Sequence, residues 1–291
     1  MINVVGLGAA GCAMADALAS YPQYSVYKLD VGLPRKGNTY PIKEQATHEA
    51  YDQSEIKLTQ FMSRMEKNKN LLFIMAGGGA ISGASLQVLK QLHQKYPKTI
   101  DLLYIKPDVD LLSDVARKRD RICYRILQEY TRSGLFRSMM VISNPHVEEA
   151  LGDLPVKTYY ENMNNYVAYA YHMLNVFTHT PSELSSSPVS RAEHVRIGTF
   201  GMLDLKESEE KMFFPLDKVV NKCYYYGITE QRLETDGKLL KQIKNQVKSG
   251  SSEQATCSYT VHSTSYEEDM AFVMCWSNQV QVYPEDHYQS I

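Results

Sequence analysis

The stretch NLLFIMAGGGAISGAS, residues 70–85, decides the fold that the sequence predicts. Its apolar residues 71–75 lead into three consecutive glycines, and an amphipathic run begins near Leu86. This order predicts a strand, a glycine loop and a helix. The backbone N–H groups of such a loop, with a helix N-terminus behind them, form a cradle for phosphate oxygens. The alternative is a tight strand-to-helix turn without a ligand, because loops are generally rich in glycine.

A second glycine cluster lies at the N-terminus. The mostly apolar residues 2–5 are followed by Gly6, Gly8 and Gly11, which complete a G-x-G-x-x-G pattern. Asp30 ends the next apolar run, where a dinucleotide site places the acid that binds the ribose. Alone, this cluster predicts an NAD(P)-dependent oxidoreductase at least as strongly as any other function. An NAD site uses one phosphate loop, however, so two glycine loops on neighbouring strands favour a mononucleotide with a longer phosphate tail.

Together the two loops resemble those of the tubulin/FtsZ superfamily. The family signature GGGTG[ST]G stands here as GGGAISG at residues 77–83, and the first loop has Cys12 where the family usually has Asn. Ala80 and Ile81 replace a hydroxyl residue and a flexible glycine, which predicts altered phosphate contacts and slower hydrolysis. The resemblance implies that GTP or GDP phosphates contact Gly8, Ala9, Ala10, Gly11, Cys12, Gly77, Gly78, Gly79, Ala80, Ile81, Ser82 and Gly83.

Composition indicates a globular protein that stays in the cytoplasm. The 291 residues are 44% hydrophobic and 22% charged, and the net charge of −2 implies no general affinity for nucleic acid or an anionic membrane. Five cysteines without C-x-x-C spacing argue against a disulfide framework or a zinc site. No run approaches the roughly 18 apolar residues of a membrane span, and the N-terminus lacks the basic lead-in of a secretion signal.

The first part of the chain alternates between strands and helices. Strands are expected at 2–6, 24–30, 71–75, 99–107 and 137–144. Their nearly continuous apolar character predicts a parallel sheet covered on both faces. Ligands of such sheets lie beyond the carboxyl ends of the strands, which is where both glycine loops, residues 106–110 and Asn144 fall.

Helices are expected between these strands. One starts at Gly11, another ends before Pro97, and a third precedes the C-cap Gly134. The third helix has apolar residues at helical spacing, namely Val115, Ile122, Ile126 and Tyr130. Residues 31–55 are polar and rich in turn formers, so a loop is expected there, and residues 56–67 are expected to be helical.

Residues 156–177 are predicted to form one long helix. Its apolar residues repeat at intervals of 4, 3, 4 and 3, and Tyr166 and Met173 add a second apolar face. A helix that is apolar on several sides is buried between two bodies of protein. In the tubulin family one central helix joins the nucleotide domain to a second domain, and the resemblance assigns that place to this helix.

Beyond the helix the sequence predicts a smaller, mainly β domain. Residues 178–190 are rich in Ser and Pro and are expected to be a loop. Strands are expected at 196–205, 222–228, 256–265 and 270–277, with one helix at 235–249. The expected fold is therefore α/β and tubulin/FtsZ-like. A parallel-sheet GTP-binding domain (1–177) ends in the central helix, and a linker or catalytic loop (178–195) leads to an α+β second domain (196–291).

Four residues are candidates for binding the guanosine. Tyr160 and Asn164 are four residues apart and share one helix face, and the family places an aromatic ring and an Asn or Asp at this spacing. The Asn164 amide offers the donor and the acceptor that a purine edge requires. Asn144 is a second candidate for the base, and Arg117 lies where relatives carry an Arg near the ribose. The alternatives are a solvated helix face for the helical residues and a turn before Pro145 for Asn144.

The metal and catalytic candidates are carboxylates. Asp30 is a candidate ligand for Mg²⁺, which favours carboxylate and phosphate oxygens, and a strand-end cap is its alternative role. In tubulin-like filaments an acidic loop of the next subunit completes the GTPase site. The family's pattern is absent here, but Glu193 and then Glu183 are the acids within reach, with Ser190 aligned to another family acid. A plain exposed Glu is the alternative for each.

The resemblance implies a GTPase that polymerises head to tail with copies of itself. The chain ends at YPEDHYQSI without a long tail that carries a membrane-adaptor peptide, which favours the compact phage- or plasmid-encoded tubulin-like proteins. These position or segregate DNA, and here DNA would be reached through an adaptor or cargo because no direct nucleic-acid signature is present. The alternatives are an NAD(P)-dependent oxidoreductase and a tubulin-like regulator that binds nucleotide without hydrolysing it.

Overall fold

The computed structural model describes residues 1–67, 69–186, 191–252 and 255–283. We call the part before the central helix the first lobe. Its elements are β1 (Ile2–Leu7), α1 (Gly8–Leu18), β2 (Tyr24–Asp30), β3 (Thr39–Pro41), α2 (His48–Asp52), α3 (Thr59–Met62), β4 (Leu71–Ala76), the 3-10 helix η1 (Ala80–Ala84), α4 (Ser85–Lys95), β5 (Ile100–Lys106), η2 (Val109–Leu111), α5 (Asp114–Arg132), β6 (Ser138–Ser143) and α6 (Asn144–Leu151).

The central helix and the second lobe follow. A short 3-10 turn, η3 (Val156–Thr158), leads into the central helix α7 (Tyr159–His179). The elements of the second lobe are β7 (Leu184–Ser185), β8 (Ile197–Asp204), β9 (Glu209–Met212), β10 (Val219–Thr229), α8 (Glu230–Thr235), α9 (Leu239–Ser249), β11 (Thr256–Thr264) and β12 (Met270–Ser277).

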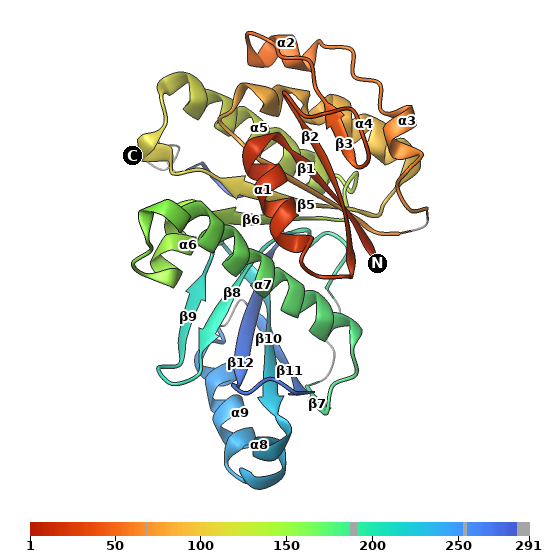
Figure 1. The fold of residues 1–291 in the computed structure, drawn as a ribbon. Coiled ribbons are helices and arrows are strands. Elements are labelled where there is room, and N and C mark those ends of the chain that lie inside the picture. Colours follow the sequence, from red (N-terminus) through yellow and green to blue (C-terminus); the bar gives the residue numbers. More distant parts are fainter. Residues whose placement is uncertain (68, 187–190, 253–254, 284–291) are drawn as a thin grey trace, which may run out of the picture.

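One 12-stranded sheet runs through both lobes (Figure 1). Its strand order is β3-β2-β1-β4-β5-β6-β8-β12-β10-β11-β7, and β9 pairs with β8 outside this path. The first six strands in this order are parallel, as expected. The lobes join where β6 pairs with β8 in parallel, through Met139 opposite Ile197 and Met140 opposite Gly198. The molecule therefore has the α/β architecture that the sequence predicts.

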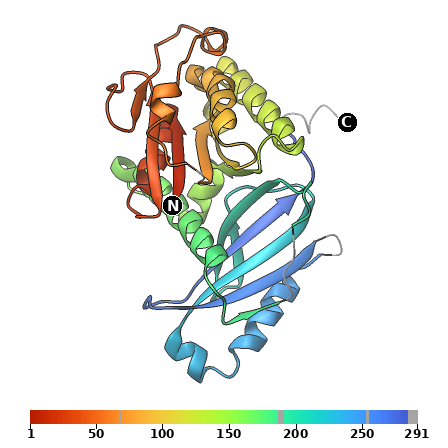
Figure 2. The ribbon, with the colours of Figure 1, turned by 90° about the vertical axis from the view of Figure 1, so that its right-hand side faces the viewer.

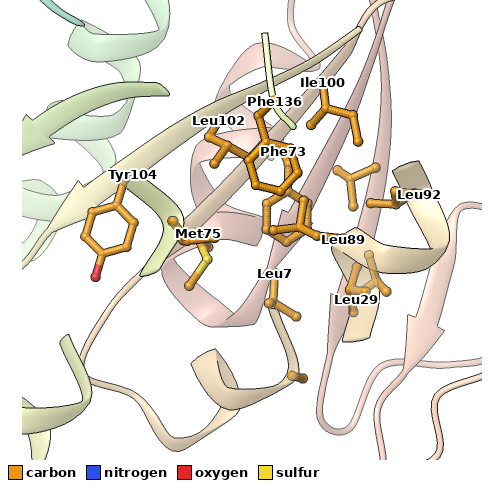
Figure 3. Packing of buried hydrophobic residues seen from close by; sticks show 14 of the residues in the cluster. Leu7, Leu29, Phe73, Met75, Leu89, Leu92, Ile100, Leu102, Tyr104 and Phe136 are labelled. Atoms are coloured by element: carbon orange, nitrogen blue, oxygen red, sulfur yellow. The ribbon is translucent and has the colours of Figure 1, made fainter. Parts of the chain in front are cut away.

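Alternate residues of the parallel strands are buried on opposite faces of the sheet. Val5, Phe73 and Leu102 pack under α4 and α5 in one cluster, part of which Figure 3 shows. Val4 and Ile74 belong to a second cluster with residues of α1, α6 and α7. Successive residues of a strand point to opposite faces of the sheet, and helices cover both faces here. Side chains on both faces must therefore be apolar, which explains the continuous apolar runs of these strands.

The prediction of one unbroken central helix is confirmed. Helix α7 is 21 residues long, which corresponds to about 30 Å, and it crosses between the two lobes (Figure 1). Its residues Met163, Val167 and Leu174 are buried in a cluster that also contains Phe200 and Phe272 of the second lobe. None of the helices in the described parts of the chain is long and apolar enough to cross a membrane.

Four local expectations are wrong. Residues 31–55 contain β3 and α2 besides loops, and the helix expected at 56–67 is limited to the four residues of α3. The region 235–249 holds the end of α8 and the separate helix α9, and α1 begins three residues earlier than expected, at Gly8. Tertiary burial outweighs the local polar composition in the first case, since Ile42 and Tyr51 pack into the first-lobe core.

Helix α5 also presents an unexpected face to the core. Three of its four apolar residues at helical spacing, Val115, Ile122 and Tyr130, are more than a third exposed. The buried face consists of Asp120, Cys123, Tyr124, Leu127, Gln128 and Thr131. The buried face is therefore mixed, and the hydrogen-bond partners of Asp120 and Gln128 come from other parts of the chain.

Candidate functional site

The register of the parallel strands aligns their carboxyl ends at one edge of the sheet. Leu7 pairs with Leu29 and Met75, the last residues of β1 lying level with the ends of β2 and β4. Lys106, at the end of β5, pairs with Ser143 at the end of β6. The segments that follow these strands therefore meet at this edge. They carry Gly8, Gly77 and Asn144, and Asp30 is the last residue of β2 itself.

The first glycine loop is shaped partly by packing. Gly8 has φ +72°, a conformation that favours glycine. A Cβ on Gly11 would lie 2.4 Å from the carbonyl oxygen of Ile74, and a Cβ on Gly6 would lie 2.5 Å from the carbonyl oxygen of Gly11. Close backbone approach thus accounts for Gly6 and Gly11 without any ligand. Ala9 and Ala10, by contrast, are exposed at the start of α1.

In the second loop the glycines differ in what requires them. Gly78 has φ +81°, and a Cβ on Gly77 would collide with Asp120. Gly79 is exposed, has the ordinary angles φ −68° and ψ 148°, and would meet nothing closer than 3.9 Å with a Cβ. No packing or backbone demand in the described residues accounts for glycine there, so Gly79 is the position where an approaching ligand best explains it.

The two loops meet at one side chain. The Cγ2 of Ile81 is the nearest atom to the Cβ positions of both Gly8, at 2.9 Å, and Gly79, at 3.9 Å. Ile81 belongs to η1, which continues the second loop into α4. The loops therefore face the same space, and the Ile81 side chain lies between them.

Several predicted phosphate-binding residues have side chains turned away from this space. The Ser82 hydroxyl is buried and donates to the carbonyl oxygen of Gly79 at 2.6 Å. The Cys12 thiol faces the carbonyl oxygens of Gly6 and Leu29 at 3.5 and 3.7 Å. Burial and then the nearby Asp30 carboxylate raise the pKa of Cys12 to about 12, so the thiol is neutral. Ser82 and Cys12 can offer a ligand only backbone groups.

The predicted base-binding residues lie at the same edge of the sheet. The last residues of α7, Thr178 and His179, line a cavity together with Asp101 and Arg137, which lie at the amino ends of β5 and β6. The C-terminal end of α7 is therefore at the amino edge of the sheet, and the first turn of α7 is at the carboxyl edge. Tyr160 in that turn is 69% exposed, which leaves its ring open to stacking. Asn144 and Asn164 are half-buried at the starts of α6 and α7.

Arg117 and Asp30 have structural partners. The Arg117 Nη2 donates to the carbonyl oxygens of Val109 and Leu112, at 3.2 and 3.5 Å, and so holds the turn η2. The Asp30 Oδ1 accepts a hydrogen bond of 2.8 Å from the Val31 backbone, which is the strand-end cap. The described residues contain no cluster of three His, Cys, Asp or Glu that could hold a metal, so Mg²⁺ beside Asp30 would need phosphate oxygens as its other ligands.

The two candidate catalytic acids lie after the far end of α7. Glu183 is exposed beside β7, and its backbone N–H donates to the carbonyl oxygen of Val261 at 2.8 Å. Glu193 is exposed in the segment before β8, while Ser190 lies outside the described residues. The length of α7, about 30 Å, separates this segment from Tyr160 within one molecule.

A buried charged cluster that the sequence pattern did not predict lies under the second loop. Asp120 is fully buried and forms an ion pair of 3.2 Å with the buried Lys106. It also accepts hydrogen bonds from Tyr104 at 2.6 Å and from Tyr283 at 2.8 Å. Burial and then the Asp120 charge raise the pKa of Tyr104 well above its ordinary value, so its hydroxyl remains a donor. A lysine that ends an apolar strand was the available sequence signal.

A cavity of about 680 Å³ lies between the lobes at the opposite, amino edge of the sheet. Arg191 stacks over the ring of Trp276 there at 4.0 Å, and Asp101 pairs with Arg137. Because α7 and the sheet separate this cavity from the glycine loops, it does not serve as their ligand pocket.

The solved structures that the whole fold resembles include several FtsZ and TubZ structures. The fold matches an FtsZ dimer structure from M. jannaschii with TM-score 0.69 and 12% identity, covering 97% of this chain and 89% of that chain. It matches a GTPγS-form protofilament of TubZ from Bacillus thuringiensis serovar israelensis with TM-score 0.70 and 13% identity, over 99% and 88% of the two chains.

A third structure, a TubZ described as a type III plasmid segregation protein, has TM-score 0.69 and 14% identity over 99% and 90% of the chains. By sequence, no family model and no curated protein matches this chain. The chain therefore has a tubulin/FtsZ-like fold, and the fold is what these comparisons establish.

Proposed function

We propose that this protein binds GTP and GDP at the carboxyl edge of the parallel sheet. The observation that carries the proposal is the convergence of two glycine loops on one space, with Gly79 open toward it. In this site the loop amides and the N-terminus of α1 bind phosphates, and Asp30 assists Mg²⁺. Tyr160 stacks on the guanine, Asn164 and Asn144 bind its edge, and the ribose lies near Arg117.

We further propose that the protein polymerises head to tail and that a neighbouring copy completes its GTPase site. One neighbour in fold is a protofilament of TubZ. Within one molecule the acidic residues of segment 178–195 lie at the end of α7 remote from Tyr160, so they reach a nucleotide only in the next subunit. Glu193 is the proposed acid that positions the attacking water, with Glu183 second.

The proposed layout assigns residues 1–177 to the nucleotide domain, 178–195 to the catalytic loop and 196–291 to the second domain. DNA segregation in the cytoplasm, through an adaptor or cargo, is the proposed setting, because one TubZ of this fold is described as a plasmid segregation protein. A tubulin-like regulator without hydrolysis is the second candidate. Two observations favour this regulator: the Ser82 hydroxyl already donates to the Gly79 carbonyl oxygen, and the Ile81 side chain lies between the loops.

Binding calorimetry with GTP, ATP and NAD tests the nucleotide. We expect GTP to bind, and tight binding of NAD without GTP would refute the proposal in favour of an oxidoreductase. Asn164→Ala should weaken GTP binding by about 1–3 kcal/mol, since it leaves polar groups of the base unpaired. Asn165→Ala is the matched control because Asn165 is exposed on the adjacent position of α7. Equal affinities of the two variants would remove Asn164 from the site.

A further inference from the structure

The chain returns to the first lobe after its last strand. Residues 278–283, which we call the strap, follow β12 and run beside α5 (Figure 2). The Gln281 backbone N–H donates to Gln128 Oε1 at 2.7 Å, and Gln128 Nε2 donates to the Gln281 carbonyl oxygen at 3.2 Å. Both glutamines are buried. The strap is therefore fixed on the buried face of α5 by Gln128.

Tyr283, at the end of the strap, contacts both members of the buried ion pair. Its hydroxyl donates to Asp120 Oδ2 at 2.8 Å, and the Lys106 Nζ lies 3.7 Å from the centroid of its ring. The Tyr283 side chain is itself buried. One residue from the far end of the chain thus satisfies the anion by a hydrogen bond and the cation by its aromatic face.

The same carboxylate supports the first residue of the second glycine loop. A Cβ on Gly77 would lie 1.9 Å from Asp120 Oδ1 and 2.2 Å from the Tyr104 hydroxyl. Only hydrogen therefore fits between the Gly77 backbone and Asp120, so the position of this carboxylate limits where the backbone that leads to Gly79 can lie. Three donors hold the carboxylate in place, and one of them comes from the strap.

We propose that Tyr283 is a positioning residue of the phosphate loop, which acts through Asp120 so that docking of the strap sets nucleotide affinity. This inference rests on the proposed function. Removing a donor from a buried carboxylate costs free energy, so the carboxylate moves or becomes hydrated. The Gly77 backbone, which contacts this carboxylate, then shifts as well. By thermodynamic linkage, a nucleotide that binds the ordered loop tightens the strap to the same extent.

Amide hydrogen exchange of the ligand-free protein tests the coupling between strap and loop. Tyr283→Phe keeps the ring and removes the hydroxyl, and we expect exchange at residues 77–79 to rise at least about fivefold. Exchange in β11 and β12 should stay unchanged, whereas a merely structural role would raise it throughout. Tyr130→Phe is the matched control, because Tyr130 is an exposed tyrosine of α5, the helix that carries Asp120.

Calorimetry with GTP tests the consequence for binding. Tyr283→Phe should weaken GTP binding by at least about fivefold and Tyr130→Phe should not. Reciprocally, GTP should slow exchange in residues 278–283 of the unmodified protein. If Tyr283→Phe does not fold, Gln128→Leu releases the strap from α5 and carries the same expectations.

The two proposals fail in different ways. Absence of GTP binding by the unmodified protein refutes the proposed function, and the exchange experiment then still decides the coupling. Unchanged exchange at residues 77–79, or GTP affinity of Tyr283→Phe equal to that of the control, overturns the inference.

Discussion

Replacing Gly11 by alanine should destabilise the first lobe. The new Cβ would lie 2.4 Å from the Ile74 carbonyl oxygen, whereas real Cβ contacts are essentially never below 3.0 Å. Both colliding parts are backbone, so no side-chain rotation relieves the contact, and α1 must move away from β4. Overpacking a rigid contact costs about 1–3 kcal/mol or more, and we expect about 3 kcal/mol here.

This loss converts into a measurable melting temperature. For 291 residues the unfolding entropy is about 0.6 kcal/mol/K, so about 3 kcal/mol lowers Tm by about 5 °C. Urea unfolding followed by circular dichroism gives the free-energy difference directly. A loss below about 1 kcal/mol would refute the argument that packing requires this glycine.

Gly79→Ala provides the opposite expectation. Its backbone angles are ordinary and its Cβ would have space, so the unfolding free energy should match that of Gly237→Ala, another glycine with open surroundings. If the loops hold phosphates, Gly79→Ala should nevertheless weaken GTP binding while Gly237→Ala does not. An alanine at Gly79 that changed neither stability nor binding would contradict the assignment of this residue to the ligand.

Three further predictions concern catalysis, assembly and pH. Glu193→Ala should leave GTP binding intact and slow hydrolysis by about 100-fold in a phosphate-release assay, and unchanged rates in both Glu193→Ala and Glu183→Ala would favour the non-hydrolysing regulator. The hydrolysis rate per molecule should rise steeply with protein concentration once light scattering detects filaments, and a concentration-independent rate would exclude a shared site. Burial lowers the pKa of His172, so its charged form is disfavoured in the folded state. Stability should therefore fall as the pH drops below about 6.5, and the fall should end once the pH is below the pKa of His172 in the folded state. The urea midpoint of His172→Gln should depend less on pH than that of the unmodified protein.

The parallel sheet and α7 could be predicted because their residues carry a local pattern. The run 71–75 predicted β4, and the spacing of Met163, Val167 and Leu174 predicted a helix buried on several sides. An apolar pattern predicts that a face is buried without specifying which element packs on it, so no knowledge of distant partners is needed.

The inner face of α5 could not be predicted in this way. Asp120 and Gln128 are polar, and they are buried because Tyr283 and Gln281, 163 and 153 residues further along, supply hydrogen bonds. Helical periodicity selects apolar residues as the inner face, so it selected Val115 and other residues that are exposed.

Only part of the candidate site could be predicted from the sequence. The positions of the glycine loops follow from where strands end, and the sequence contains that information. Which glycines serve packing does not follow from spacing, because Gly11 is required by Ile74 and Gly77 by Asp120. Only three-dimensional contacts separate these residues from Gly79.

The long reach of the strap has a consequence for how the protein matures during synthesis. The contact between Asp120 and Tyr283 joins residues 163 positions apart. At typical elongation rates the ribosome needs roughly 8–30 s to add that length of chain. During this interval the first lobe can form its strands and helices, but Lys106 and Asp120 are still open to water on the side that Tyr283 later covers. The underside of the glycine loop is therefore among the last parts of the molecule to acquire its final structure.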